Sequence, residues 1–416
     1  MPAPTYDMVR TGTLFDPYWD LTRVGARAAL ERIGPAEPVI VAVIDSGVDV
    51  ANAELKPYLW VNSREEREGL NGVDDDGNGV VDDIHGARFI GDRVDGDVRD
   101  EDGHGTLLCG TIAGVARQKL GLGTDVPPIK LMAVKFFDPS TLPASENATP
   151  AIRYAIDQGA DIITASWDVG IQTAALAAAL EYAEARGVLV VAAAGNFGSD
   201  NDRLPTWPAS TPLGNMLAVM ATDERDERAG FSNFGRTTVH LGAPGVEVMS
   251  TARSFTGPRW LPYWGTSPAC AHVAGAAALL KALNPSWTAE MLKTHLMRSA
   301  SPVPGLECVA EGRLDLRRAL AGPLAGLTLP QGKVWKAGEQ LTVSWDRLYE
   351  TPGCRTVSLL LSEDGGRRFG VILAEDRPNT GTCLVQLPAR SIPQARLRLT
   401  SDQSQFSTDS EIFAVV

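Results

Sequence analysis

Apolar runs and small-residue helical stretches alternate along the first three quarters of the chain. Four of these runs are almost entirely apolar and lack the alternation of apolar and polar residues that a half-exposed strand shows. Such runs are typical of strands buried on both faces of a parallel sheet. They span residues 39–44, 130–134, 162–165 and 188–194. The stretches between and after them have the length and composition of helices, over residues 107–115, 149–158, 173–186 and 292–300. Repeated units of this size predict an α/β fold with a mostly parallel sheet and helices on both faces.

The pattern changes near residue 320. Residues 321–327 are rich in Gly, Ala and Pro and predict a linker between two domains. Beyond them come short strand-like segments separated by turn residues, over 341–345, 357–361, 370–373, 383–387 and 395–399. That spacing is typical of a small all-β sandwich. We therefore expect a large α/β domain over 1–320 and a β-sandwich domain over 328–416.

Composition limits the partners of the chain. The 416 residues carry a formal net charge of −13, and Ala321 onward contains ten basic and ten acidic residues, so the excess acid lies in the first domain. This balance argues against nucleic acid and suits cations or cationic peptides. No stretch approaches the roughly 18 apolar residues of a membrane span, so no membrane partner is expected. The five cysteines form no C-x-x-C pair, which favours a reducing, cytoplasmic setting; a missing upstream signal would instead make the protein secreted.

Four polar residues lie where the predicted elements place reactive groups. Ser267 opens a small-residue helix, where unpaired N–H groups and the helix dipole favour a developing oxyanion. Asp45 comes directly after the first buried run, at the strand end where catalytic groups collect in α/β sheets. His104 lies between two glycines, which leave room for backbone to approach the imidazole. Asn196 follows the last apolar run.

Short motifs around these residues occur in the order Asp, His, Asn, Ser, as Val43–Gly47, Asp102–Thr106, Ala193–Asn196 and Gly265–Ser267. In this order the chain resembles the subtilisin-like serine proteases, or subtilases, and the likeness spans most of residues 1–320. The resemblance implies that the first domain is a three-layer α/β/α sandwich around a parallel sheet. It also implies catalysis through an acyl-enzyme.

The resemblance gives each of the four residues a role. Ser267 would be the nucleophile, and His104 the general base that later protonates the leaving amine. Asp45 would orient the imidazole and stabilise its charged form. Asn196 would donate its side-chain amide to the oxyanion, beside the backbone N–H of Ser267.

The same resemblance places substrate-binding residues in two segments. They are Ser166, Trp167, Asp168, Ala193 and Gly195. These segments would line the pocket for the residue before the scissile bond, with the carboxylate of Asp168 where the family has glycine. Together with Asp200 and Asp202, it would favour Arg or Lys in that pocket through charge-assisted hydrogen bonds. The alternative is that all three carboxylates point to solvent.

An acidic segment over residues 71–83 alternates oxygen-bearing side chains with glycines. Its spacing is that of the first half of an EF-hand loop, which wraps a hard cation. The candidate ligands are Asp74, Asp76, Asn78, the carbonyl of Val80, and Asp83. Similar insertions in subtilases are associated with calcium, so we expect a structural Ca²⁺; a solvated acidic loop is the alternative. At a second calcium site of the family, Glu54 matches the carboxylate ligand, but residues 116–119 are cationic and no ion is expected.

The expected function is that of a calcium-stabilised serine endopeptidase acting on peptide or protein substrates. One alternative is a peptide ligase, which passes the acyl-enzyme to an amine; Ala271, where the family has Pro, favours it because the extra N–H can draw the serine inward. Another is an inactive subtilase that serves as a binding scaffold. The second domain resembles the immunoglobulin-like sandwiches of secreted bacterial metalloproteases and would bind a protein partner or stabilise the catalytic domain.

Overall fold

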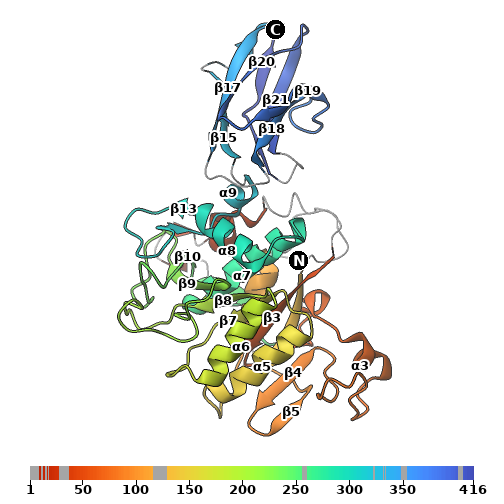
Figure 1. The fold of residues 1–416 in the computed structure, drawn as a ribbon, viewed down its shortest axis with the longest axis vertical. Helices are drawn as coiled ribbons and strands as arrows, with labels where there is room; N and C mark the ends of the chain where they lie inside the picture. The colour runs from red at the N-terminus through yellow and green to blue at the C-terminus, as the bar shows by residue number, and fades with distance from the viewer. Residues whose placement is uncertain are drawn as a thin grey trace. The chain divides into compact units, whose positions relative to one another are not determined.

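The structure, a computed structural model, describes residues 9–10, 13–14, 16, 18–27, 37–115, 129–254, 260–321, 324–330, 332, 334–347, 354–401 and 406–416. The chain divides into two compact units, Met1–Leu316 and Arg317–Val416. The first contains both helices and strands, and the second is built mainly of strands (Figure 1). Among the described residues, no helix is both long enough and apolar enough to cross a membrane.

The first unit alternates strands and helices along most of its length. Its strands are β1 (Val9–Arg10), β2 (Thr13–Leu14), β3 (Val39–Asp45), β4 (Gly86–Ile90), β5 (Arg93–Asp95), β6 (Ile129–Lys135), β7 (Ile162–Ala165), β8 (Leu189–Ala193), β9 (Met216–Thr222), β10 (Leu241–Pro244), β11 (Val248–Thr251), β12 (Trp260–Tyr263), β13 (Ser301–Pro302) and β14 (Gly312–Arg313). Its helices are α1 (Trp19–Val24), the 3-10 helix η1 (Lys56–Tyr58), α3 (Ser63–Glu68), α4 (His104–Val115), α5 (Ser145–Asp157), α6 (Ala174–Ala185), α7 (Thr266–Leu283) and α8 (Ala289–Arg298).

A ten-stranded sheet forms the centre of this unit, in the order β13-β14-β10-β9-β8-β7-β3-β6-β4-β5. Every neighbouring pair from β14 to β4 is parallel, and only the outermost pairs, β13 with β14 and β4 with β5, are antiparallel. The four apolar runs of the sequence form β3, β6, β7 and β8. The prediction of an α/β fold with a mostly parallel sheet is therefore confirmed.

Helices cover both faces of the sheet, which gives the unit its three layers. Figure 1 shows α5 and α6 side by side over the strands, and α4 and α7 pack against each other on the other face. Ala42 and Ile44 of β3 belong to the core cluster that includes residues of α5 and α6, so the residues that alternate with them face the α4 and α7 layer. Because parallel strands end at one edge, β3, β7 and β8 bring their carboxyl ends together there.

The second unit contains two β-sheets, as the strand pattern predicts. Its strands are β15 (Leu324–Thr328), β16 (Val334–Trp335), β17 (Gln340–Arg347), β18 (Thr356–Ser362), β19 (Val371–Pro378), β20 (Thr382–Gln386), β21 (Ile392–Ser401), β22 (Ser407–Asp409) and β23 (Phe413–Val415), after the helix α9 (Leu316–Ala321). One sheet has the order β15-β17-β20, and the other has the order β16-β23-β21-β18-β19 with β22 paired to β21.

The linker expected over residues 321–327 is largely a strand in the structure. β15 begins at Leu324 and pairs with β17 in antiparallel fashion. The side chains of Leu324 and Leu327 are buried. The Gly and Pro residues of this segment suggested a flexible connection. Removing its leucine side chains from water favours an ordered strand within the second unit instead.

Candidate active site

The buried strand β3 ends in Asp45, whose side chain is fully buried. Its Oδ1 accepts the backbone N–H of Ser46 and lies 2.8 Å from Nδ1 of His104. An ionised carboxylate only accepts, so Nδ1 carries the proton and Nε2 keeps its lone pair. The strand end is fixed by the indole N–H of Trp167, which donates to the carbonyl oxygen of Ile44 at 2.8 Å. Asp45 therefore orients the imidazole from a rigid position.

His104 is the first residue of α4, and the loop before it is organised by Asp100. The Asp100 carboxylate is buried and accepts hydrogen bonds from the hydroxyl of Ser46, the N–H of Gly103, and the N–H and hydroxyl of Thr106. Position 105 must be glycine, because a Cβ there would lie 2.1 Å from the carbonyl oxygen of Gly47. This close approach brings α4 against the end of β3. The sequence reasoning did not single out Asp100, although it lies in the acidic run just before the histidine.

Acidic groups control the protonation of His104. Burial of the imidazole opposes its charging, but the negative charges of Asp45, Asp102 and Asp100 outweigh that effect and raise the pKa of His104. A histidine acts as a general base only when it is neutral. Because its pKa is raised, the imidazole of His104 stays protonated up to a higher pH than an isolated imidazole does.

Asp102 offers a way to test this control. It is exposed, and its Oδ1 accepts the backbone N–H of His104 at 3.1 Å. Asp102→Asn keeps the acceptor and removes the charge, so we expect the pKa of His104 to fall and the acidic limb of the kcat/KM profile to move to lower pH. Glu181→Gln, an exposed residue of α6, gives the same charge change as a control. An acidic limb that stays in place in both variants would show that Asp102 does not act on the imidazole.

The nucleophile candidate lies in the first turn of α7. Gly265 precedes the helix at a φ of 140°, a conformation that favours glycine. The Ser267 hydroxyl donates a hydrogen bond to the carbonyl oxygen of Ser166 at 3.1 Å. Because Asp45 occupies Nδ1 of His104, Nε2 is the imidazole nitrogen that remains available to a further partner.

Asn196 is oriented by the residue before the nucleophile. Its Oδ1 accepts the backbone N–H of Thr266 at 2.8 Å and the Thr266 hydroxyl at 3.1 Å. A backbone N–H only donates, which fixes the amide with its oxygen toward Thr266 and leaves the two Nδ2 hydrogens for other acceptors. Ser267 lies in the first turn of its helix, where a backbone N–H has no acceptor within the helix. These two donors are the ones that the sequence assigns to the oxyanion.

The substrate-binding candidates have different surroundings. Ser166 lies against the nucleophile, since its carbonyl accepts the Ser267 hydroxyl. Ala193 is buried at the end of β8, and a Cβ on Gly195 would lie 2.5 Å from the side-chain nitrogen of Asn233. The side chain of Trp167 belongs to the core and its ring lies 4.8 Å from that of Phe136. Its indole thus supports β3, and the pocket role expected for this segment stays a prediction.

The three carboxylates expected to face the substrate are not equivalent. Asp202 accepts hydrogen bonds from the N–H groups of Arg236, Thr237 and Thr238 and from the hydroxyls of both threonines. Asp200 accepts the N–H of Asp202 and lies 3.4 Å from the guanidinium of Arg203. Asp168 is exposed, and partial desolvation of its carboxyl raises its pKa. Asp202 therefore supports the loop at 236–238, which sets it apart from Asp168.

The acidic loop over residues 71–83 uses its side chains in two ways. Asp74 turns back onto the loop and accepts the N–H groups of Gly77, Asn78 and Gly79, and the hydrogen bond from Gly79 contributes most to lowering its pKa. Asn78 likewise binds protein groups, because its Oδ1 accepts the N–H of Val80 and its Nδ2 donates to Asp83. As oriented here, both side chains order the loop.

Two further carboxylates of this loop converge with a third from helix α3. Glu65, Asp76 and Asp83 each offer an oxygen, and these atoms lie within 4.8 Å of one another. Glu65 and Asp83 are fully buried, and burial raises the pKa of Asp83. Oε2 of Glu65 has no hydrogen-bond partner among the described residues. The sequence did not indicate Glu65, because its helix α3, Ser-Arg-Glu-Glu-Arg-Glu, has the composition of an exposed helix.

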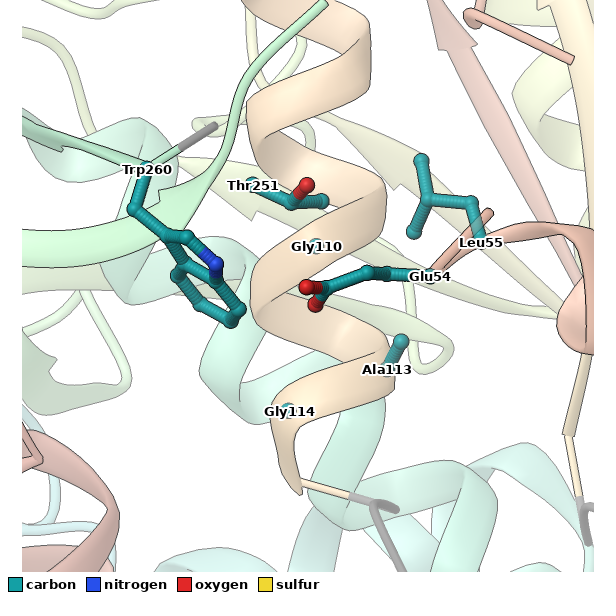
Figure 2. Close-up of a pocket in the computed structure, with 7 residues that line it drawn as sticks. All are labelled: Glu54, Leu55, Gly110, Ala113, Gly114, Thr251 and Trp260. Atoms are coloured by element: carbon teal, nitrogen blue, oxygen red, sulfur yellow. The ribbon is translucent and has the colours of Figure 1, made fainter. Parts of the chain in front are cut away.

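Glu54 lines a small cavity along α4. Its other lining residues are Leu55, Gly110, Ala113, Gly114, Thr251 and Trp260. Figure 2 shows the Glu54 carboxylate and the Trp260 indole directed toward each other over the glycine-bearing side of α4. The cavity has a volume of about 10 Å³, which suits a single water molecule. Residues 116–119, whose charge argues against an ion beside Glu54, lie outside the described residues.

The fold and the order of its polar residues are those of the subtilase class of serine proteases: Asp45 ends a strand of the parallel sheet, His104 begins one helix and Ser267 lies in the first turn of another. The chain belongs to the Subtilase family, whose profile, Peptidase_S8, matches residues 36–326. It is 32% identical over 301 residues to Subtilisin Savinase of Lederbergia lenta, which covers 72% of this chain and 97% of that protein. It is 35% identical over 268 residues to the thermophilic serine proteinase of Bacillus sp. (strain AK1), which covers 64% of this chain and 55% of that protein.

Proposed function

We propose that this protein is a serine endopeptidase in which Ser267, His104 and Asp45 act as the catalytic triad. The observation that carries the proposal is the 2.8 Å contact between Nδ1 of His104 and the buried carboxylate of Asp45. This contact sets the tautomer that a general base requires. The retention of the oxyanion donor Asn196, oriented by Thr266, further supports hydrolysis over a role as an inactive scaffold.

In the proposed reaction, Nε2 of His104 takes the proton of the Ser267 hydroxyl as the serine oxygen attacks the substrate carbonyl carbon. The Asp45 carboxylate stabilises the imidazolium that forms. Negative charge develops on the carbonyl oxygen, which accepts hydrogen bonds from Nδ2 of Asn196 and the backbone N–H of Ser267. The imidazolium then protonates the leaving amine, and water repeats the sequence on the acyl-enzyme.

A fluorophosphonate probe and casein test this proposal together. We expect the probe to label Ser267 and casein to be cleaved. Labelling accompanied by transfer of the acyl group to an added amine, with little hydrolysis, would favour the ligase alternative. A protein that neither reacts with the probe nor cleaves casein would be a scaffold.

We further propose that the enzyme favours Arg or Lys before the scissile bond. Asp168 supports this preference because it follows closely on Ser166, whose carbonyl contacts the nucleophile. Its carboxyl is partly desolvated, which raises its pKa, and a substrate cation would offset that cost. The carboxylate of Asp202, by contrast, already accepts hydrogen bonds from the backbone N–H groups of the loop at 236–238.

Asp168→Asn tests the preference directly. A charge-assisted hydrogen bond contributes about 1.5 kcal/mol, so we expect kcat/KM for an Arg substrate to fall about tenfold relative to a Phe substrate. Asp200→Asn is the matched control, because its carboxylate already faces Arg203. Peptide libraries read out both variants. A wild-type preference for Phe or Leu that Asp168→Asn leaves unaltered would mean that the pocket is apolar.

We also propose that the carboxylates of Glu65, Asp76 and Asp83 bind one Ca²⁺ ion. Two fully buried carboxylates beside a third are unfavourable unless a cation compensates their charge. Oxygen ligands of this kind suit calcium. This set retains two of the ligands expected from the sequence and adds Glu65, whose unpartnered Oε2 is the observation that favours an ion.

A further inference from the structure

A buried pair links the N-terminal helix α1 to the helix that carries the nucleophile. Oδ2 of Asp20, in α1, lies 2.8 Å from Nε2 of His272, in α7. Nδ1 of the same imidazole lies 2.8 Å from the carbonyl oxygen of Pro268. Both side chains are buried, with 3% of Asp20 and none of His272 exposed. The imidazole thus contacts both Asp20, 252 positions away in sequence, and Pro268, which follows Ser267.

The chemistry of the two partners fixes how His272 is held. A carbonyl oxygen only accepts, so Nδ1 donates its hydrogen to Pro268. Nε2 then faces the Asp20 carboxylate at hydrogen-bonding distance. Both contacts of the imidazole lie in a fully buried position. Loss of Asp20 would therefore leave Nε2 without a partner, and the imidazole could relieve this only by moving, which would disturb its contact with Pro268.

The first turn of α7 has two contacts with other segments and one with a side chain of its own helix. The N–H of Thr266 donates to Asn196, and the hydroxyl of Ser267 donates to the Ser166 carbonyl. The third contact is the one from His272 to the carbonyl of Pro268. This turn carries both the attacking oxygen and one oxyanion donor, the N–H of Ser267. A shift in its position would therefore change both groups together.

Helix α1 is anchored independently of this contact. The guanidinium of Arg23 forms two hydrogen bonds of 2.9 Å with the carboxylate of Asp226. The indole N–H of Trp19 donates to the carbonyl of Glu247 at 3.4 Å. Asp20 therefore extends toward His272 from a helix that other contacts keep in place.

We propose that Asp20 is a positioning residue for catalysis: acting through His272, it fixes the first turn of α7 and with it the geometry of Ser267. This inference rests on the proposed peptidase function. It gives Asp20 a role in addition to its place in the helix that precedes the first buried strand. A misplacement of about 1 Å in a catalytic group is enough to lower a rate about a hundredfold, so a modest shift has a measurable effect.

Asp20→Ala and Asp20→Asn in the full chain distinguish positioning from simple packing. In Asp20→Asn, the amide donates to Nε2 of a neutral imidazole, so both contacts of His272 are kept and we expect near wild-type rates. In Asp20→Ala we expect kcat and the rate of fluorophosphonate labelling to fall about tenfold with little change in KM. If Asp20→Ala does not fold, Asp20→Ser, with a hydroxyl too short to take the place of the carboxylate, replaces it.

Arg88→Ala is the matched control, because it removes a partly buried ion pair of β4 that involves neither α1 nor His272. We expect it to lower the melting temperature without changing the labelling rate. Equal labelling rates per folded molecule in wild type, Asp20→Ala and Arg88→Ala would overturn the inference and leave the pair a packing contact. A wild-type protein that does not react with the probe would instead overturn the proposed function, and the inference with it.

Discussion

We expect Ser267→Ala to lower kcat for peptide hydrolysis by about 10⁶-fold, the size of the loss that subtilisin shows when its nucleophile is removed. The reason is that no other group can form the acyl-enzyme. The fold should persist, because the substitution removes one oxygen whose hydrogen bond to Ser166 contributes only about 1 kcal/mol. Casein cleavage, fluorophosphonate labelling and a thermal melt measure the three consequences.

Ser250→Ala is the matched control for this variant. Its hydroxyl is also buried and donates a single hydrogen bond, to the carbonyl of Leu107 at 2.6 Å. We expect a similar small loss of stability and near wild-type cleavage of casein. Cleavage by Ser267→Ala at the wild-type rate would show that the assignment of the triad is wrong.

The fold of the first unit could be predicted because its signals are local. Buried parallel strands are apolar along their whole length, and no other common element combines such runs with intervening helices. The candidate catalytic residues also had local signals: Asp45 follows a buried run, Ser267 opens a small-residue helix, and His104 lies between two glycines. At position 105 the structure explains the glycine, since any Cβ would collide with the backbone of Gly47.

Contacts between distant segments could not be predicted in the same way. The order of residues does not indicate that the Trp167 indole turns into the core to hold Ile44. Nor does it indicate that Asp202 faces the loop at 236–238. Asp20 and His272 carried no signal either, because an isolated acid and an isolated histidine have many ordinary roles. Each of these depends on which side chains the folded chain brings together.

Glu65 is another residue that the sequence did not indicate, because α3 has the composition of an exposed helix. The proposed calcium ion beside it has the second large effect that we expect. An ion that binds only the folded state stabilises it by about 2.7 kcal/mol when its concentration is a hundred times Kd. We therefore expect chelation to lower the melting temperature of the wild-type protein by several degrees, and calcium to restore it. A melting temperature that is indifferent to chelator would exclude a structural calcium ion.

Glu65→Gln locates the ion. Glu65 is buried and its Oε2 is unpartnered among the described residues, so the substitution removes a proposed ligand. Without calcium, Gln also relieves the repulsion among three close carboxylates, so the variant should melt no lower than the chelated wild type. With calcium, we expect it to lose most of the wild-type increase. Glu66→Gln, an exposed neighbour on the same helix, makes the same charge change and should keep the full response. Equal responses in the two variants would mean that calcium, if bound, is held without Glu65.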